Sequence, residues 1–328
     1  RYEDATQAVH PLDIFSGERV GGIFAAEPLR NDYLLPAATI TWNFADNQQL
    51  RFGASKTIAR PHFRELAPQQ YTDPDNDRLF FGNPFLVDSE LTNFDLRYEW
   101  FFDAGEYFTA GLFHKTIDKP VEAVVGDFGG NQLFQGFLNA PEATLYGVEL
   151  EFKKYFDPEL RWLDGGRLYV ATNYTWSSSE VNAAESDTVI PPGFNGVPQA
   201  ARSFVADGSR MQGQSEHIAN LQFGIENEAA ELQATLIANY VSERISVRGR
   251  GGQPDYMEDP GATLDFVLRK GLSQAGWGWD RFKPSLSFSA RNILNRSHEE
   301  YQERDGARID LYTYKPGISW DVSLTLAF

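Results

Sequence analysis

The chain has 328 residues, of which 42% are hydrophobic and 14% aromatic, with a formal net charge of −17 and no cysteine. The acidic balance disfavours nucleic acid as a partner, because phosphate binding requires clustered lysine and arginine. The absence of cysteine excludes disulfides, cysteine-ligated zinc and thiol catalysis. The sequence also lacks the run of about 18 apolar residues that a membrane-spanning helix needs.

Apolar and polar residues alternate along much of the chain, and a period of two residues predicts β-strands. In residues 91–102, for example, Phe94 and Leu96 share one face while Arg97 and Glu99 share the other. Many of these segments exceed the ~5–6 residues of a strand in a globular sheet and suit the ~9–11 of a tilted transmembrane strand. The predicted strands, preceded by a partial strand near residues 1–6, are 33–44, 49–61, 91–102, 107–125, 142–156, 167–181, 210–227, 231–249, 260–273, 283–302 and 310–328.

The connections between these segments alternate in length. Short or compact connections occur at 45–48, 103–106, 157–166, 227–230 and 274–282. The long ones occur at 62–90, 126–141, 182–209 and 250–259, and the last connection, 303–309, is brief. An up-and-down meander with short turns at one end and long loops at the other is typical of an outer-membrane barrel. The sequence therefore predicts an all-β, transmembrane, antiparallel up-and-down barrel, and a soluble β-sandwich is the alternative.

Charged side chains recur on the second face of the predicted strands. An unpaired charge in a packed core is very costly, so this face must meet water, and a large barrel holds water in its lumen. Aromatic residues such as Trp42, Trp100 and Tyr155 lie beside the short turns, where an interfacial girdle is expected. The predicted residues facing the lumen or a plug inside it are Arg97, Glu99, Glu149, Glu151, Arg291 and Asp321.

The first long loop contains three aspartates at alternate positions, Asp73, Asp75 and Asp77, which resemble the opening of a calcium loop. The glycine expected next is Arg78, and Pro84 occupies the twelfth position, where a calcium loop has glutamate. A solvated acidic loop is the favoured interpretation, and a cation site is the alternative.

Other loop residues could bind a ligand, because function gathers on long loops held by a rigid scaffold. The loops 62–90, 126–141 and 182–209 are the predicted ligand lid. In R-P-H-F-R at 60–64, a cationic group lies beside an aromatic ring, although Arg60 could simply hold the loop at the strand exit, which is the favoured interpretation. The loop 126–141 mixes apolar rings with amides, which would suit a sugar or a small amphipathic ligand but also loop-on-loop packing, the interpretation we favour; the residues are Phe128, Asn131, Gln132, Phe134, Gln135 and Phe137.

No catalytic constellation is recognisable in the sequence. The five histidines are scattered, no serine lies in a G-x-S-x-G motif, and G-R-G-G at 249–252 precedes no predicted helix. The sequence predicts neither an enzyme nor a bound cofactor.

Several short phrases resemble those of TonB-dependent outer-membrane receptors. They occur in the family's order across roughly residues 33–328, and include S-K-T-I-A-R-P at 55–61, F-R-E-L-A-P at 63–68, G-N-P-F-L at 82–86, Y-G-V-E-L-E at 146–151 and R-N-I-L-N at 291–295. The resemblance implies an active transporter in the outer membrane of a Gram-negative bacterium. Its ligand would be a scarce nutrient such as a siderophore–metal complex, cobalamin or a saccharide.

The resemblance also implies a larger protein. The family's barrel has about 22 strands and a plug inside it, so residues 1–328 would be the C-terminal part, with the plug, the TonB box and the first strands outside this chain. The implied partners are outer-membrane lipid, lipopolysaccharide, the rest of the barrel with its plug, and TonB. A passive porin-like channel and a surface-binding barrel protein are the alternatives, and an upstream plug with a TonB box would distinguish the transporter from the porin.

Overall fold

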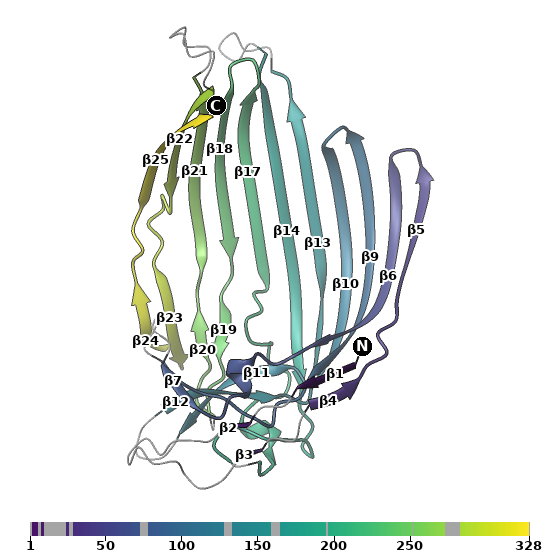
Figure 1. Cartoon of the computed structure of the whole chain (residues 1–328), viewed down its shortest axis with the longest axis vertical. Coiled ribbons are helices and arrows are strands. Elements are labelled where there is room, and N and C mark those ends of the chain that lie inside the picture. Colours follow the sequence, from purple (N-terminus) through teal and green to yellow (C-terminus); the bar gives the residue numbers. More distant parts are fainter. Residues whose placement is uncertain are drawn as a thin grey trace.

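The main body of the protein is one antiparallel sheet of eleven strands that follow one another in chain order (Figure 1). The structure is a computed structural model that describes residues 2–5, 8–9, 24–25, 29–72, 78–127, 133–158, 165–194, 196–250, 252–272 and 283–327. The strands, which we call the wall, are β5 (Ala37–Ala45), β6 (Gln48–Ala59), β9 (Ser89–Asp103), β10 (Glu106–Asp118), β13 (Glu142–Phe156), β14 (Arg167–Asn182), β17 (His217–Asn227), β18 (Leu232–Val241), β21 (Gly261–Gly271), β22 (Lys283–Arg291) and β25 (Ser319–Ala327). The up-and-down order predicted from the sequence is confirmed.

The wall is curved but open, because β5 and β25 form its two edges. Within the described part of the chain, neither strand has a neighbour on its outer side. Each edge therefore presents a row of backbone N–H and C=O groups with no partner strand. The eleven strands are part of a barrel and not a closed one.

The two ends of the wall differ as the connection lengths predicted. Short turns join the strands at the upper end of Figure 1, and the long connections gather at the lower end. The turn between β9 and β10 shows why a short connection suffices, since Gly105 adopts a φ of 78°, which is easy only for glycine. We call these the short-turn end and the loop end.

Four predicted strands are wrong in extent, because each divides in two near the loop end. The segment 107–125 breaks at Lys119, which has a φ of 55°, and at Pro120, which has no N–H to donate to a sheet. The segment 283–302 breaks where Asn292 and Asn295 adopt φ values of 55° and 53°, and 310–328 breaks at Gly317, whose φ is 77°. The pieces beyond the breaks are β11 (Val121–Asp127), β19 (Arg244–Val247), β23 (His298–Arg304) and β24 (Ala307–Tyr314).

The long connections hold more β structure than the sequence predicted. Residues 126–141, predicted as a loop, include β12 (Leu133–Asn139), which pairs with β11, and β8 (Leu79–Phe81) and β7 (Gln70–Thr72) extend this sheet. A second four-stranded sheet has the order β19-β20-β23-β24, with β20 at Tyr256–Glu258. We call these two sheets, together with all the long connections at the loop end of the wall, the loop cap.

Smaller elements complete the chain. The segment 303–309 is the tight turn of the β23–β24 hairpin, and the predicted strand 210–227 begins only at His217. The predicted strand near residues 1–6 is β1 (Tyr2–Ala5), which pairs with β4 (Leu29–Asp32) outside the wall. The other pairs are β2 (Ala8–Val9) with β3 (Phe24–Ala25) and β15 (Thr188–Val189) with β16 (Gln199–Ala200).

Within the described residues, the helices are few and short. They are α1 (Phe63–Leu66) and the 3-10 turn η2 (Ala201–Ser203). No helix in the described ranges is long and apolar enough to cross a membrane.

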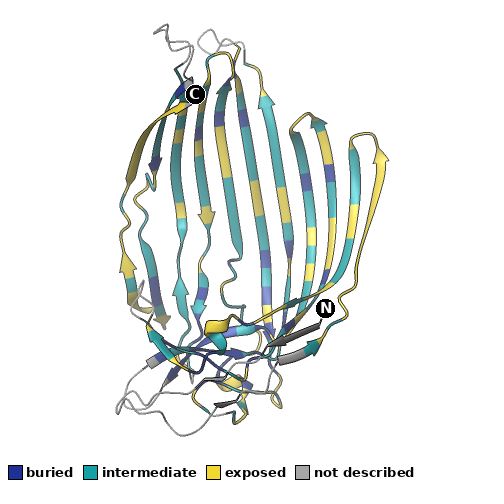
Figure 2. Ribbon diagram, in the orientation of Figure 1, coloured by how far each residue is buried: buried dark blue, intermediate teal, exposed yellow. Residues whose placement is uncertain are grey.

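The hydrophobic cores lie in the loop cap. Figure 2 shows buried residues gathered at the loop end, whereas the wall is mostly half-buried or exposed. One core includes Val124, Leu138, Val181 and Val205, and a second packs Leu86 among the aromatic rings of the cap. The burial of apolar area thus stabilises the cap from within, while the wall is only one layer thick.

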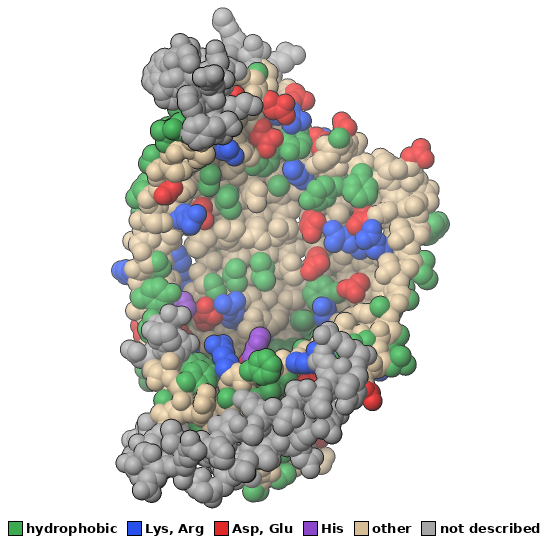
Figure 3. Space-filling view, viewed as in Figure 1, with side chains coloured by type: hydrophobic (Ala, Val, Ile, Leu, Met, Phe, Trp, Pro, Cys, Tyr) green, Lys and Arg blue, Asp and Glu red, His purple; other side chains and the backbone are tan. Residues whose placement is uncertain are grey.

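The two faces of the wall carry different chemistry. On the outer face, Leu96 pairs with Phe52 and Leu112, and these side chains are 38%, 45% and 54% exposed, respectively. The residues that alternate with these, including Arg97 and Glu99, lie on the inner face. Figure 3 shows basic and acidic side chains in the hollow of the molecule over β6, β9 and β10. The alternation read from the sequence therefore separates an apolar face from a charged one.

Candidate ligand-binding site

A network of charges lies on the inner face of β6, β9, β10 and β13. Glu99 is only 7% exposed and accepts hydrogen bonds from Gln49 and Arg51, the latter at 3.4 Å. Arg97 Nε lies 3.1 Å from Glu99, and Arg97 Nη2 lies 3.1 Å from Glu151. The contact between Arg97 and Glu151 is a hydrogen-bonded ion pair, and such pairs hold side chains in place on a partly buried surface.

The structure brings together three of the six residues predicted to face a lumen, namely Arg97, Glu99 and Glu151. Glu149 lies on the same face of β13, opposite Gly111. Arg291 and Asp321 lie near the other edge of the wall, on β22 and β25, where they pair in register with Ser319 and Ser289. Their contact with a plug stays a prediction.

A cavity of about 520 Å³ lies where the inner face of the wall meets the loop cap. The wall contributes Leu91 of β9 and Ile117 of β10. The cap contributes Phe80, Phe137 and Gln212. The cavity is thus lined by apolar and polar groups together, with more polar than apolar surface.

Basic residues gather at the cavity, from the end of β6 and the short helix α1. They are Arg60, His62 and Arg64, and among the described residues that line the cavity the only acidic one is Glu65. The Glu65 carboxylate accepts a hydrogen bond from the His62 backbone N–H at 2.8 Å. Phe63, between the basic residues, is 80% exposed. Arg60 does follow the strand exit, as favoured from the sequence, but it also lines the cavity.

Three of the six ligand candidates from the loop 126–141 are described, and two of them pack within the cap. Phe134 and Phe137 are 3% and 7% exposed, and Phe137 lies 6.3 Å from Phe80 between ring centroids. Gln135 lines the cavity, and its Oε1 atom is buried without a hydrogen-bond donor from any described residue. A buried acceptor without a donor is costly, so this atom is available to a ligand that carries one.

The remaining candidates lie outside the described residues. They are Phe128, Asn131 and Gln132 of the loop 126–141 and the possible cation loop of Asp73, Asp75 and Asp77. Within the described part of the chain, no group of three or more histidine, aspartate or glutamate residues is arranged to hold a metal ion.

Asn83 and Gly82 were not singled out from the sequence as site residues, although they belong to the phrase G-N-P-F-L. Asn83 is 1% exposed, and its Nδ2 donates to the carbonyl oxygens of Phe137 and Ile190, both at 2.8 Å. A side chain at Gly82 would meet the backbone of Ala67, with a Cβ only 2.1 Å from its oxygen. The phrase therefore fixes the first long loop against two others.

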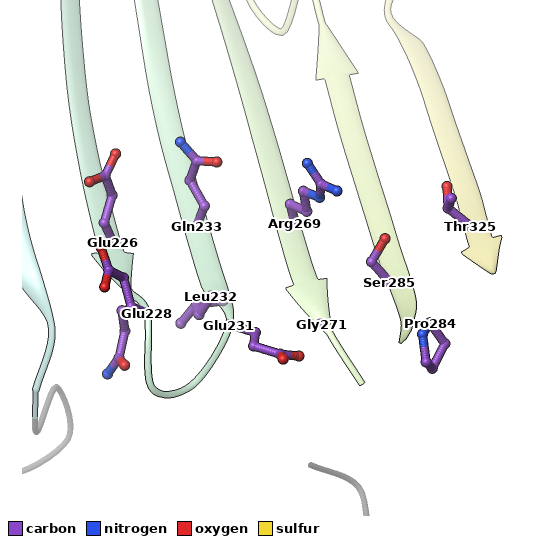
Figure 4. Close-up of a pocket in the computed structure, with 11 residues that line it drawn as sticks. Glu226, Glu228, Glu231, Leu232, Gln233, Arg269, Gly271, Pro284, Ser285 and Thr325 are labelled. Atoms are coloured by element: carbon purple, nitrogen blue, oxygen red, sulfur yellow. The ribbon is translucent and has the colours of Figure 1, made fainter. Parts of the chain in front are cut away.

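A second cavity, of about 510 Å³, lies at the short-turn end of the wall (Figure 4). Figure 4 shows Glu226, Gln233 and Arg269 on neighbouring strands, with Ser285 and Thr325 farther along the wall. Glu228 and Glu231 add acidic groups from the turn between β17 and β18. Acidic side chains alone do not identify a ligand, so we assign none.

A buried tyrosine in the cap gives a prediction about alkaline pH. Burial, followed by a 2.8 Å hydrogen bond to the Glu243 carboxylate, raises the pKa of Tyr301 from 10.0 to about 12. The unfolded chain therefore ionises first, so the stability from Tyr301 is complete below the unfolded pKa and is lost as pH rises through the folded one. We expect Tyr301→Phe to lower the melting temperature at neutral pH but to flatten its fall between pH 10 and 12. An equally steep fall in the variant would contradict the prediction.

Comparison with known families gives a match over most of the chain. Residues 1–293 match the model of the TonB dependent receptor-like β-barrel. The match confirms the resemblance drawn from the phrases at 55–61 and 82–86. No curated protein sequence matches the chain significantly.

Solved structures share the fold at low sequence identity. A mutant of the ferric enterobactin receptor PfeA from Pseudomonas aeruginosa, in complex with enterobactin, aligns with a TM-score of 0.55 and 15% identity over 90% of this chain and 41% of its own. The ferric yersiniabactin uptake receptor FyuA from Yersinia pestis aligns with a TM-score of 0.54 and 15% identity, over 94% of this chain and 40% of its own. The siderophore receptor PirA from Acinetobacter baumannii aligns with a TM-score of 0.51 and 14% identity, over 88% of this chain and 40% of its own. The chain thus spans about 40% of the length of these receptors.

Proposed function

The chain belongs to the TonB-dependent receptor β-barrel family, and we propose that it is part of an outer-membrane transporter that takes up a scarce nutrient. The observation that carries the proposal is the family match over residues 1–293, on a wall with one apolar and one charged face. The transporter is energised through TonB, and the chain itself supplies wall, inner surface and loops. It performs no catalysis.

The outer face would lie in the lipid of a Gram-negative outer membrane. Its exposed apolar side chains suit hydrocarbon, in which charges are costly. The short-turn end would then face the periplasm and the loop cap the outside, since barrels of this kind have short periplasmic turns and longer external loops. Lipopolysaccharide would surround the loop end.

We also propose that this wall is completed by a further barrel segment. In lipid, the free backbone groups along β5 and β25 would each be costly, so both edges need partner strands. A plug inside the barrel would contact the inner face, with the network of Arg97, Glu99 and Glu151 as part of the contact surface.

The ligand would bind in the cavity under the loop cap. Among the described lining residues, two arginines outnumber the single carboxylate, which favours an anionic ligand, since opposite charges attract more strongly where water is partly excluded. The structural relatives named above are a ferric enterobactin receptor, a ferric yersiniabactin uptake receptor and a siderophore receptor, so a ferric siderophore is the first class to examine. Cobalamin and saccharides are the other candidates.

The test is uptake in cells with and without the gene for this protein. Radioactive ferric enterobactin, ferric yersiniabactin, cyanocobalamin and a maltodextrin would be supplied at micromolar concentration. We expect saturable uptake of one class, lost when the gene is deleted and when a protonophore collapses the proton gradient. Uptake that persists without the gradient would support the porin-like alternative instead.

Conductance in planar bilayers gives an independent check on the same alternative. The complete protein with its plug should show no steady open-channel current, whereas a porin-like channel should conduct continuously. A protein that binds ligand at the cell surface without any uptake would instead fit the surface-binding alternative.

A further inference from the structure

The backbones of the two sheets of the loop cap are joined at Arg248. Val125 N–H of β11 donates to the Arg248 carbonyl at 3.0 Å, and Arg248 N–H donates to the Ala123 carbonyl at 2.9 Å. These bonds form a parallel bridge between Val124 and Arg248. The sheet β7-β8-β12-β11 therefore continues into β19-β20-β23-β24, so the cap has one hydrogen-bonded backbone across the loop end.

The Arg248 side chain reinforces this joint. It is 1% exposed, and its Nε lies 2.9 Å from a carboxylate oxygen of Glu122, which is also 1% exposed. Nη1 donates to Ser209 Oγ at 3.0 Å and lies 3.3 Å from Asp255, and Nη2 donates to the carbonyl of Arg210. A single buried guanidinium thus contacts three separate connections.

Glu122 extends the joint to the cavity. Its carboxylate accepts the backbone N–H of Gln212 at 3.2 Å. The Gln212 side chain in turn accepts from Ala123 N–H and donates to the carbonyl of Ser246, both at 2.5 Å. Gln212 lines the cavity, so the cavity wall and the joint share one hydrogen-bond network.

Contacts farther from the joint link the first and the last of the long connections to the rest of the cap. Glu300 of β23 forms an ion pair with Arg78 of the first long loop and accepts from Ser246 Oγ. Asn83 holds the same loop to β12 through the Phe137 carbonyl. All five long connections of the wall are therefore linked directly or through one neighbour.

The joint is sensitive to the loss of either charge. Burial raises the pKa of the Glu122 carboxyl, and the Arg248 guanidinium opposes that shift. Buried pairs of this kind contribute little relative to hydrophobic replacements, but removing one partner leaves an uncompensated buried charge.

We propose that the Glu122–Arg248 joint makes the loop cap a single cooperative unit, which opens and closes as a whole and not loop by loop. Cooperative opening follows because movement of one sheet alone would leave the charge on the other sheet buried without its partner. That the cavity binds the transported ligand rests on the proposed function. On that basis, the ligand would gain access to the cavity through a single two-state opening of the loop cap.

Hydrogen exchange on the complete protein in lipid bilayers tests the proposal without any ligand. The informative amides are Asn83, Val125, Gly213 and Asp259, which donate to Glu65, Arg248, Ile245 and Glu299, respectively. In the unmodified protein we expect these four amides to share one opening equilibrium. In Arg248→Met, all four should exchange about 100-fold faster or more, with the wall amides of β13 and β14 unchanged.

Two further variants keep the test decisive. Arg202→Met removes an exposed pair with Asp207, with side chains 42% and 50% exposed, and should leave all four amides as they were. The double variant Glu122→Leu, Arg248→Met removes both charges and should recover much of the protection lost in Arg248→Met. Acceleration confined to Val125 and Gly213, with Asn83 and Asp259 unchanged, would overturn the proposal, as would no recovery in the double variant.

Discussion

Leu96→Arg should prevent the barrel from folding into a membrane. Leu96 lies at the middle of β9 on the outer face and is 38% exposed between Phe52 and Leu112. An arginine on the lipid face at the bilayer midplane costs about 2–4 kcal/mol. Refolding of the complete protein into lipid vesicles, followed by the heat-modifiable shift of folded barrels on gels, should show a large loss of folded product.

The matched control is the adjacent residue. Asp95 lies on the inner face of the same strand and is exposed, so Asp95→Arg introduces the same side chain into the predicted aqueous lumen. It should fold nearly as well as the unmodified protein, and so should Arg97→Ala. Equal losses in Leu96→Arg and Asp95→Arg would show that the two faces have been assigned wrongly.

Gly82→Ala should disrupt the loop cap while leaving the wall intact. The new Cβ would lie 2.1 Å from the Ala67 oxygen and 2.7 Å from its carbonyl carbon, so backbone must move. That movement would disturb the 2.6 Å hydrogen bond from Asn83 N–H to the Glu65 carbonyl. Overpacking of this kind costs about 1–3 kcal/mol, and hydrogen exchange at Asn83 and Leu86 should accelerate accordingly.

Gly53→Ala is the control for the Gly82 substitution. Gly53 lies in β6, and a Cβ there would meet only Asp95 side-chain atoms at 3.7 and 3.8 Å, which is ordinary contact. The same one-carbon change should therefore leave both cap and wall unaffected. An effect as large as that of Gly82→Ala would refute the steric explanation.

The alternation of apolar and polar residues predicted the wall strands well, because this alternation is a local property of each strand. Each strand has one apolar and one polar face whatever its neighbours are, so Leu96 and Arg97 could be assigned opposite faces from their positions alone. The lengths of the connections then gave the strand order, since short turns force neighbouring strands to pair. The same reasoning failed at Lys119 and Asn292, because a left-handed backbone interrupts a strand without interrupting the alternation.

The candidate site was less predictable. The cationic segment at 60–64 was noticed, but its place beside Leu91, Phe80 and Gln212 depends on loops far apart in the sequence. Phe134 and Phe137 suited both ligand binding and loop-on-loop packing, and packing was the favoured interpretation. Their burial was decided by the loops around them, which no local pattern specifies.

By itself, the sequence determined the number of wall strands, their up-and-down order, the two faces of the wall and the family. These depend on side-chain alternation and connection length, both of which can be read directly from the sequence. Only the tertiary structure decided that the long connections build one cap, with Arg248 joining its two sheets and Glu122 buried against it. The reason is physical: a residue 126 positions away can compensate a buried charge only once folding has brought the two together.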